Sequence, residues 1–594
     1  MSASRFFPAY LRSDRLWIVL LGALLFIPYL GGVHLFDWDE INFAECAREM
    51  LVSGRFLQVQ IGFEPFWEKP PLFFWLQAVS MSLFGVDAFA ARLPNALAGI
   101  ATLLLVYELG FRLRDRLFAR LWVLAWLGSV LPHFYFRSGI IDPWFNFWIF
   151  SALWVYFRSQ QMPGYVGGVL GRLSPNAQAI LGGLLLGVAV LTKGPVAGLI
   201  AALTLTVYVL YWKGRRPCLS IPRTAVFGVA AVLASASWFL VDMALHGPWL
   251  TTEFIKYQYR LFSTPDAGHG GFPGYHVVVL LLGCFPASVF ALSAFRHNKG
   301  RSAAGCSVNS SGRRVEALSE DDKMFLTEDF RRWMLALFWV VLVLFSIVRS
   351  KIVHYSSLAY FPVTFLAAYV LHGYLRSRKP LSLWQTALLA VLAVFILAGA
   401  VLLPYAGMHM DWFLAHFKPS DAFAVEAMQA GVAWSLWDYL PALVFGVLVF
   451  AGIVWARRAR WRAALIVLFG GTALFVQLGL YFFVGKIEHY SQRAAIEFCE
   501  SKAGEPVYLA PLYHKSYAHW FYGRVPDDWP AEAKDPSYLL RGALDRDAFF
   551  IVKADHLHLA EREHPDLELL YKKNGFVFFK RRAQSENHSE PGPD

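Results

Sequence analysis

The sequence contains little charge for its length. Asp, Glu, Lys and Arg make up 16% of the 594 residues, whereas 57% of the residues are hydrophobic. In soluble globular domains about a quarter of the residues are charged, so this chain is expected to bury apolar surface in lipid as well as in a protein core. The net charge of +11 is attributed to cytoplasmic loops, and no nucleic-acid partner is expected.

Cysteine is also scarce. The five cysteines (Cys46, Cys218, Cys284, Cys306 and Cys499) are scattered and never form a CxxC pair, which argues against a disulfide framework or a zinc ribbon. No internal repeat is apparent. A cleavable signal peptide is not expected, because the first apolar run, residues 16–33, is too long for the apolar core of one and no small-residue cleavage site follows it.

Long apolar runs dominate the chain up to residue 485. About thirteen membrane spans are expected, at residues 16–34, 94–111, 117–132, 142–157, 177–192, 194–212, 223–241, 275–295, 333–349, 353–374, 383–403, 437–455 and 463–484. Lys and Arg gather in alternate loops, which places those loops and the N-terminus in the cytoplasm. The same alternation puts residues 35–93, 133–141, 242–274, 404–436 and everything after about 485 on the outer face.

The composition changes near residue 486, where charged residues become frequent. Short β-rich runs at 506–509, 548–552 and 575–579, with a helical stretch near 490–502, predict a small α/β domain. The expected fold is therefore mainly α: a transmembrane domain at 1–485, an extracytoplasmic α/β domain at 486–583 and a disordered tail at 584–594. Residues 301–328 are polar and are expected to form a flexible linker.

Residues 36–94 form the most acidic stretch beside a predicted span, with Asp37, Asp39, Glu40, Glu45 and Glu49 near its start. Carboxylates are costly to hold beside a membrane segment and often mark a functional site. Asp39 would then be a base or a metal ligand directed at a substrate. The alternative is structural, since Asp39 could cap a helix that runs through residues 44–52.

Lysines at predicted outer helix ends are unexpected, because the positive-inside bias disfavours them there. Lys69 precedes two prolines, and Lys193 stands in a short Gly-Pro turn between two apolar segments. An ammonium group suits a phosphate as a point charge. The alternatives are an interfacial anchor for Lys69 and snorkelling to the lipid headgroups for Lys193.

Three further outer segments carry polar candidates. Asp142 precedes Pro143 at the start of a span, where it could equally be a helix N-cap. His269 lies in a glycine-rich loop, and Lys351 and His354 stand at another outer helix end. The convergence of acids and lysines at one face suggests a site for a lipid phosphate, with a carboxylate as general base for an acceptor hydroxyl.

Several motifs together resemble a known family. They are DEINFAECAREML, FWEKPPLFFWL, FGVDAFAARLPNALAG, LTKGP, GHGG and SKIVHY, which run in family order from about residue 37 to 362. They resemble the bacterial branch of the polyprenyl-phosphate-dependent glycosyltransferases of GT-C type, which includes the aminoarabinose transferase of lipid A and relatives of the protein O-mannosyltransferases. The resemblance implies about thirteen spans, a periplasmic active site and C-terminal domain, and sugar transfer from undecaprenyl phosphate, usually with inversion.

The resemblance also implies roles for individual residues. Asp39 matches the catalytic acid of the first periplasmic loop, and Asp142 matches a second acid in the next one. Lys69 and Lys193 match lysines that bind the donor phosphate.

Other matched positions have less specific roles. Glu68 and His269 match ligands of a divalent metal, which is zinc in the aminoarabinose transferase; magnesium or manganese are the other candidates. Arg260, Lys351 and His354 match polar positions around the cavity, and the hypothesis assigns them to the donor phosphate.

The chain departs from the family at two places. Many relatives carry Arg-Tyr where this chain has Asn42-Phe43, and a proline where it has Val353. The sugar and the acceptor, a lipid, glycan or protein of the envelope, are therefore left open. The alternative function is a transporter or flippase of lipid-linked saccharides. Either protein would be a multi-pass protein of the bacterial inner membrane.

Overall fold

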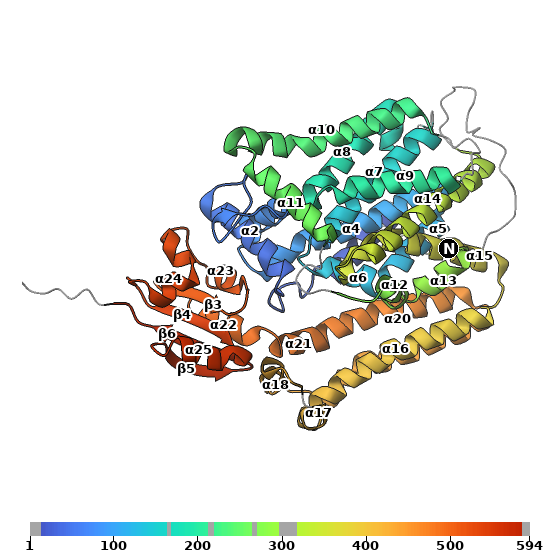
Figure 1. Cartoon of the computed structure of the whole chain (residues 1–594). Coiled ribbons are helices and arrows are strands. Elements are labelled where there is room, and N and C mark those ends of the chain that lie inside the picture. Colours follow the sequence, from blue (N-terminus) through green and yellow to red (C-terminus); the bar gives the residue numbers. More distant parts are fainter. Residues whose placement is uncertain are drawn as a thin grey trace, which may run out of the picture.

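The computed structural model describes residues 13–162, 165, 168–211, 219–263, 270–295, 318–417 and 419–584. A bundle of long helices makes up most of the protein, and a small domain with a four-stranded sheet lies at one end of it (Figure 1). Helix α2 (Asp39–Ser53) lies at the same end of the bundle as this domain. The mainly helical, polytopic fold predicted from the sequence is confirmed.

The helices of the first half of the bundle are α1 (Asp14–Phe26), α3 (Leu72–Phe84), α4 (Ala88–Leu113), α5 (Arg116–Leu127), α6 (Val130–Phe134), α7 (Asp142–Gln161), α8 (Pro175–Lys193), α9 (Val196–Tyr211), α10 (Ile221–His246) and α11 (Trp249–Ser263). Their starts follow capping rules. Asp87 and Asp115 accept hydrogen bonds from backbone amides in the first turns of α4 and α5. Proline stands in the first turn of α7 and α8, where its missing amide proton costs nothing.

The helices of the second half are α12 (Tyr275–Gly283), α13 (Ala287–Ala294), α14 (Glu320–Ile347), α15 (Tyr360–Ser377), α16 (Leu383–Met408), α17 (Met410–Phe417), α18 (Ala422–Met428), α19 (Leu440–Arg457), α20 (Trp461–Gly479) and α21 (Gly485–His489). The predicted linker 301–328 overlaps α14, which begins at Glu320, and its residues 301–317 lie outside the described part. The predicted outer segment 242–274 contains α11.

Membrane-spanning helices are numerous. Within the described residues, eight helices are long and apolar enough to cross a membrane, or up to ten if each of two bent helix pairs counts as one span. The bent pairs, residues 116–137 and 275–294, fold back by 83° and 114°. The chain is thus a multi-pass membrane protein. The total of about thirteen stays a prediction; the first expected span, 16–34, contains a helix that ends at Phe26.

Close helix packing holds the bundle together where lipid supplies no hydrophobic driving force. Gly183 and Gly187, one turn apart on α8, face α10. A Cβ atom at Gly187 would lie 2.3 Å from that of Ala234 on α10, so only glycine permits this approach. Small residues spaced by four are typical of membrane helix interfaces.

The domain after the bundle has a mixed sheet. Its strands are β3 (Tyr508–Leu512), β4 (Ala548–Lys553), β5 (Glu568–Lys573) and β6 (Phe576–Arg581), in the spatial order β3-β4-β6-β5. Strand β4 pairs with β3 in parallel and with β6 antiparallel. Its helices are α22 (Arg493–Ser501), α23 (Ala518–Tyr522), α24 (Pro536–Arg541) and α25 (Leu557–Glu563). The β-rich runs seen in the sequence overlap β3, β4 and β6; the domain boundary near 486 and the disordered tail stay predictions.

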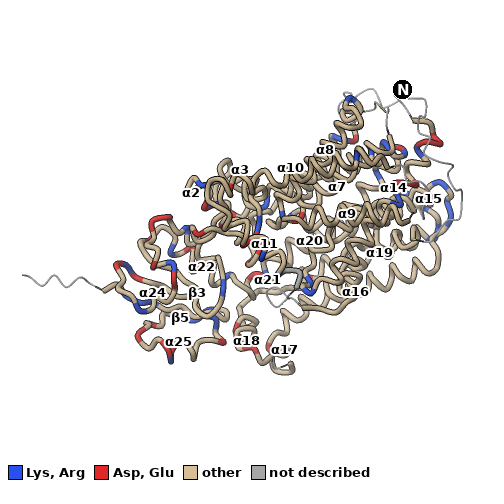
Figure 2. Tube along the Cα trace, turned by 45° about the horizontal axis from the view of Figure 1, so that its top comes forward, with Lys and Arg blue, Asp and Glu red and all other residues tan. Residues whose placement is uncertain are grey.

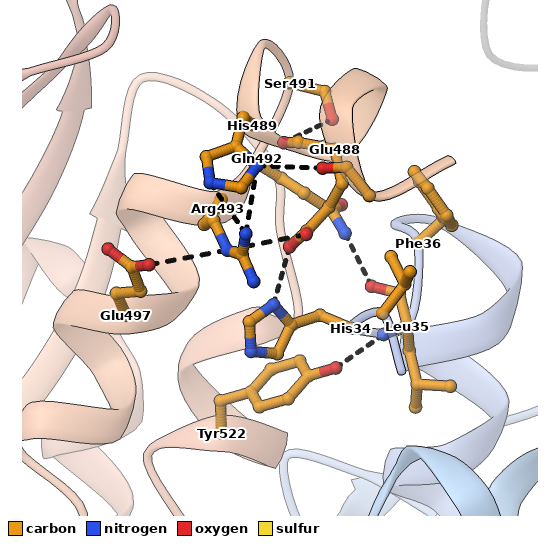
Figure 3. A network of polar contacts seen from close by, with 12 residues as sticks. His34, Leu35, Phe36, Glu488, His489, Ser491, Gln492, Arg493, Glu497 and Tyr522 are labelled. Atoms are coloured by element: carbon orange, nitrogen blue, oxygen red, sulfur yellow. Dashed lines mark hydrogen bonds and ion pairs between the residues drawn. The ribbon is translucent and has the colours of Figure 1, made fainter. Parts of the chain in front are cut away.

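A polar network joins this domain to the loop that precedes α2 (Figure 3). His34 Nδ1 lies 2.6 Å from a carboxylate oxygen of Glu488, just before α22. The Gln492 amide donates to the Leu35 carbonyl at 2.6 Å, and the Leu35 amide donates to the Tyr522 hydroxyl at 2.6 Å. Segments more than 450 residues apart in sequence are thereby fixed beside each other.

Candidate active site

A cavity of about 750 Å³ opens where the bundle meets the small domain. Its walls come from the start of α2, the loop before α3, the start of α7, the junction of α8 and α9, helix α11, the end of α14 and the short helix η5 (Val353–Ala359). Seven of the nine predicted site residues line it: Asp39, Glu68, Lys69, Asp142, Lys193, Arg260 and His354. The structure therefore brings together side chains from six separate segments.

The two aspartates have different surroundings. Asp142 is buried, and Lys193 Nζ donates to both of its carboxylate oxygens, at 2.7 and 2.8 Å. The side chain of Asp39 is 44% exposed toward the cavity. His354 Nε2 lies between them, 3.7 Å from Asp39 and 3.6 Å from Asp142. Asp39 is thus the carboxylate that a substrate can reach, and Asp142 is held by its ion pair.

Neither aspartate is the helix N-cap that the alternative interpretation expected. Helix α2 begins at Asp39 itself, with Trp38 at the N-cap position, and α7 begins at Asp142 after Ile141. No side chain caps either helix. Both carboxylates stand in a first turn, where the helix dipole favours negative charge.

Glu40, next to Asp39, fixes the start of α2. Two nitrogens of the Arg92 guanidinium donate to its carboxylate, at 2.7 and 2.9 Å, and the amides of Phe36 and Gly139 donate to it as well. Burial alone would raise the pKa of Glu40, but the Arg92 charge and these hydrogen bonds lower it below its usual value. Glu40 therefore stays ionised and positions Asp39 without being the reactive group.

Two cations share one aromatic ring on α11. Lys69 Nζ lies 3.2 Å from the Tyr257 hydroxyl and 4.8 Å from the centre of its ring. The guanidinium carbon of Arg260, one turn later on α11, lies 5.2 Å from the same ring. Two positive groups placed together at a cavity wall suit a phosphate, which accepts several charge-assisted hydrogen bonds.

Known proteins are similar in sequence to a large part of this chain. Residues 23–258 match the model of the dolichyl-phosphate-mannose-protein mannosyltransferase family. The chain is 27% identical over 433 residues to the undecaprenyl phosphate-alpha-4-amino-4-deoxy-L-arabinose arabinosyl transferase of Pectobacterium carotovorum, covering 70% of this chain and 72% of that protein. It is 30% identical to the enzyme of that name from Edwardsiella ictaluri, over 46% of this chain and 48% of that one.

A solved structure has the same fold. The crystal structure of ArnT from Cupriavidus metallidurans bound to undecaprenyl phosphate aligns with a TM-score of 0.70 and 18% identity, over 98% of this chain and 100% of that chain. This chain is a membrane glycosyltransferase of the GT-C type. The matched family region, residues 23–258, contains five of the predicted residues that line the cavity of this glycosyltransferase: Asp39, Glu68, Lys69, Asp142 and Lys193.

Of the two predicted metal ligands, one lies within the described residues of the glycosyltransferase. Glu68 lines the cavity, whereas His269 lies outside the described residues. Within the described part of the chain, no three His, Cys, Asp or Glu side chains are grouped as a metal would need. The described residues thus supply one of the two proposed ligands, and the metal stays a prediction.

Lys351 differs from its predicted role. It is absent from the cavity lining, and its Nζ donates to the carbonyls of Phe345 and Ser346, at 3.0 and 2.7 Å, and to that of Val348. These carbonyls belong to the last turn of α14, which attracts a positive charge. In the geometry seen here Lys351 caps α14 and does not face a donor phosphate.

Sequence reasoning missed several lining residues of the glycosyltransferase: Trp38, Asn146, Tyr257, Tyr355 and Lys515. Asn146 could have been found, because it lies four residues after Asp142 and so on the same face of α7. Its amide donates to Ser357 at 2.7 Å, which holds η5 against α7. No local pattern in the sequence singles out Tyr257 or Lys515.

Proposed function

We propose that this glycosyltransferase moves a sugar from an undecaprenyl (polyprenyl) phosphate to an acceptor of the cell envelope, at the periplasmic face of the inner membrane. The observation that carries the proposal is the reachable carboxylate of Asp39 in one cavity with the Lys69 and Arg260 cations. The relatives named for undecaprenyl-phosphate donors support the donor class. The acceptor is a lipid, a glycan or a protein.

The proposed reaction uses residues that line the cavity. The acceptor hydroxyl attacks the anomeric carbon and gives its proton to Asp39, while the bond between that carbon and the phosphate oxygen breaks. Both electrons of this bond leave with the lipid phosphate. Lys69 and Arg260 stabilise the charge that develops on it, so no general acid is required. Attack opposite the leaving group inverts the anomeric centre.

Asp142, Lys193 and His354 support the Asp39 side chain in the proposed site. Lys193 balances the Asp142 charge, and the pair holds the His354 imidazole within 3.7 Å of Asp39. These contacts orient the Asp39 carboxylate toward the acceptor. Glu68 and His269 are retained as proposed ligands of a divalent cation, and no step of the reaction depends on that ion.

The distribution of basic residues supports a periplasmic location for the cavity. Lys and Arg gather at the end of the bundle away from the small domain, around α15 (Figure 2). Arg112, Arg116 and Arg376 stand at helix ends there, and Asp115 pairs with Arg376. Arginines at helix ends are typical of the cytoplasmic side of a membrane protein, which supports a periplasmic side for the cavity at the opposite end.

One assay tests the proposal. The purified protein is supplied with a panel of radiolabelled undecaprenyl-phosphate sugars and a membrane extract, and release of undecaprenyl phosphate is followed. Turnover that disappears in Asp39→Asn and persists in Glu64→Gln, whose side chain is exposed outside the cavity, supports the enzyme. Labelled lipid that crosses vesicles unchanged, without release of undecaprenyl phosphate, would overturn it in favour of a flippase.

A further inference from the structure

One cavity-lining residue comes from the small C-terminal domain. Lys515 stands in the loop between β3 and α23, and all the other lining residues precede α21 in the chain. The loop is locally constrained: Tyr513 has a positive φ of 63°, and the Ala518 amide donates to the Ser516 hydroxyl at 3.2 Å. The domain therefore does more than lie beside the cavity, since it supplies a cation to the wall.

The Lys515 ammonium lies over two aromatic rings beside the cavity. Its Nζ is 4.9 Å from the centre of the Trp38 ring and 5.4 Å from that of Tyr517. Trp38 directly precedes Asp39, and both Lys515 and Asp39 line the cavity. The rings hold the lysine stem in place while its head stays exposed.

Lys515 is not neutralised by a protein carboxylate. Among the described residues none lies within ion-pair distance of its Nζ, whereas Lys502, Lys573 and Lys580 of the same domain each pair with an acid. Asp37, which also lines the cavity, is half-buried, and desolvation raises its pKa although the Lys515 charge acts against this rise. The two side chains form no ion pair, so the Lys515 ammonium can still meet an anionic ligand.

The domain that carries Lys515 is anchored to α2 and to the loop before it. Arg48 of α2 donates to the carbonyl of Val525 at 2.8 Å, and the Asp37 amide donates to Gln492 at 3.1 Å. These contacts hold the domain that carries Lys515 against α2 and the loop before it.

We propose that Lys515 is a substrate-binding residue that holds an anionic oxygen, of phosphate type, next to Asp39. This inference rests on the proposed function and deepens it. Two sources present the same chemistry: the phosphate of the donor lipid and an acidic group on the acceptor. The C-terminal domain then completes the substrate site, and its charge selects substrates that carry an anion at this position.

Three variants of the full-length protein test the proposal. Lys515→Met keeps the aliphatic stem over Trp38 and removes the charge, whereas Lys515→Arg keeps the charge. Lys572→Met, on the exposed face of β5 and outside the cavity lining, is the matched control. Each protein is assayed for the dissociation constant of undecaprenyl phosphate by tryptophan fluorescence, and for kcat, donor KM and the amount of membrane extract that gives half-maximal rate.

The two sources give different results. If the donor phosphate is the ligand, Lys515→Met raises the undecaprenyl phosphate dissociation constant and the donor KM about tenfold, as expected for one charge-assisted hydrogen bond. If the acceptor is the ligand, the dissociation constant is unchanged and the half-maximal amount of extract rises instead. In both cases Lys515→Arg keeps most of the wild-type affinity, and kcat changes little in either variant.

Other outcomes overturn the proposal. Three results would each show that Lys515 binds no anion. The first is that Lys515→Met behaves like Lys572→Met. The second is a fall in kcat with all affinities intact, and the third is an equal loss of affinity in Lys515→Met and Lys515→Arg. If the wild-type protein binds undecaprenyl phosphate but shows no turnover, the proposed function is overturned. The dissociation constants of the variants for undecaprenyl phosphate would still test the role of Lys515. If Lys515→Met does not fold, Lys515→Gln replaces it in the same assays.

Discussion

The first and the later turns of α2 carry the same residue type but use it differently. At the start of the helix, Asp39 opens into the cavity and Glu40 is held by Arg92. Further along, Glu45 and Glu49 are fully buried; Glu45 pairs with Arg48, and Glu49 accepts the amides of Gly62 and Phe63.

This difference teaches that an acidic cluster beside a membrane has two physical uses. Acids at the helix start meet a cavity where a substrate can bring positive or polar partners. In the later turns, Glu49 accepts the loop amides of the hairpin of β1 (Gln60–Ile61) and β2 (Glu64–Pro65) and fixes that loop. Substitution of the cavity acid Asp39 should therefore affect the rate, and substitution of an acid that has protein partners should affect stability.

The largest effect is expected at the start of α2. Asp39→Asn keeps the size of the side chain but removes the base, so turnover should fall by about 10²–10⁴-fold, the usual contribution of a general base. Thermal stability should stay close to that of the wild type, because the side chain is 44% exposed. Release of undecaprenyl phosphate measures the rate; a variant with normal turnover would remove Asp39 from the mechanism.

A second change breaks the support behind Asp39. Arg92→Gln leaves Glu40 buried without its guanidinium partner, and the loss of one member of a buried ion pair costs about 3–5 kcal/mol of folding free energy. The double variant Arg92→Gln/Glu40→Gln should recover part of that loss, because the uncompensated charge is gone. Denaturation of the detergent-solubilised protein measures both, and additive losses would contradict a direct pair.

The sequence predicted the helical, multi-pass fold and most of the residues that meet in the cavity, because each lay in a local motif at a predicted outer helix end. It could not separate the roles of the five acids in residues 37–49. That separation depends on Arg92, 52 residues away, and on the β1–β2 hairpin. Lys351 carried the same local signal as Lys193, but its carbonyl partners on α14 become visible only when the chain turns back on itself.

The contribution of the C-terminal domain was out of reach for a related reason. Lys515 follows Asp39 by more than 470 residues, and only the docking of β3 and α23 beside α2 brings it to the cavity. A pattern within one segment carries no information about such a contact.

In the later turns of α2, Glu49→Gln should change the pH dependence of stability more than the rate. Burial and the neighbouring Glu45 carboxylate raise the pKa of Glu49, so the folded protein favours its protonated form. Stability from this group is present below the usual carboxylate pKa and is lost as pH rises toward the folded pKa. The variant removes this titration, and its melting temperature should fall less than that of the wild type between pH 5 and pH 9.

The rate provides the control for this prediction. Glu49→Gln should keep turnover within about threefold of the wild type. The substitution alters a hydrogen bond to the hairpin loop, and the loss of one such bond has a small effect. A loss as large as that of Asp39→Asn would mean that both ends of α2 serve catalysis, and the comparison would fail.

The smallest effect is expected where the small domain meets the loop before α2. Burial alone would lower the pKa of His34, but its hydrogen bond to Glu488 and the charges of Glu488 and Glu500 together outweigh burial and raise it. The stability that this contact supplies is therefore complete below the pKa of the unfolded histidine and is lost as pH rises through the folded value. His34→Gln should lower the melting temperature at pH 5.5 and have little effect at pH 8.5, whereas a larger loss at pH 8.5 would contradict an ionic contact. This contact holds the domain that carries Lys515. If Lys515→Met weakens the affinity for undecaprenyl phosphate or for the acceptor, His34→Gln should weaken the same affinity, and at pH 5.5 only.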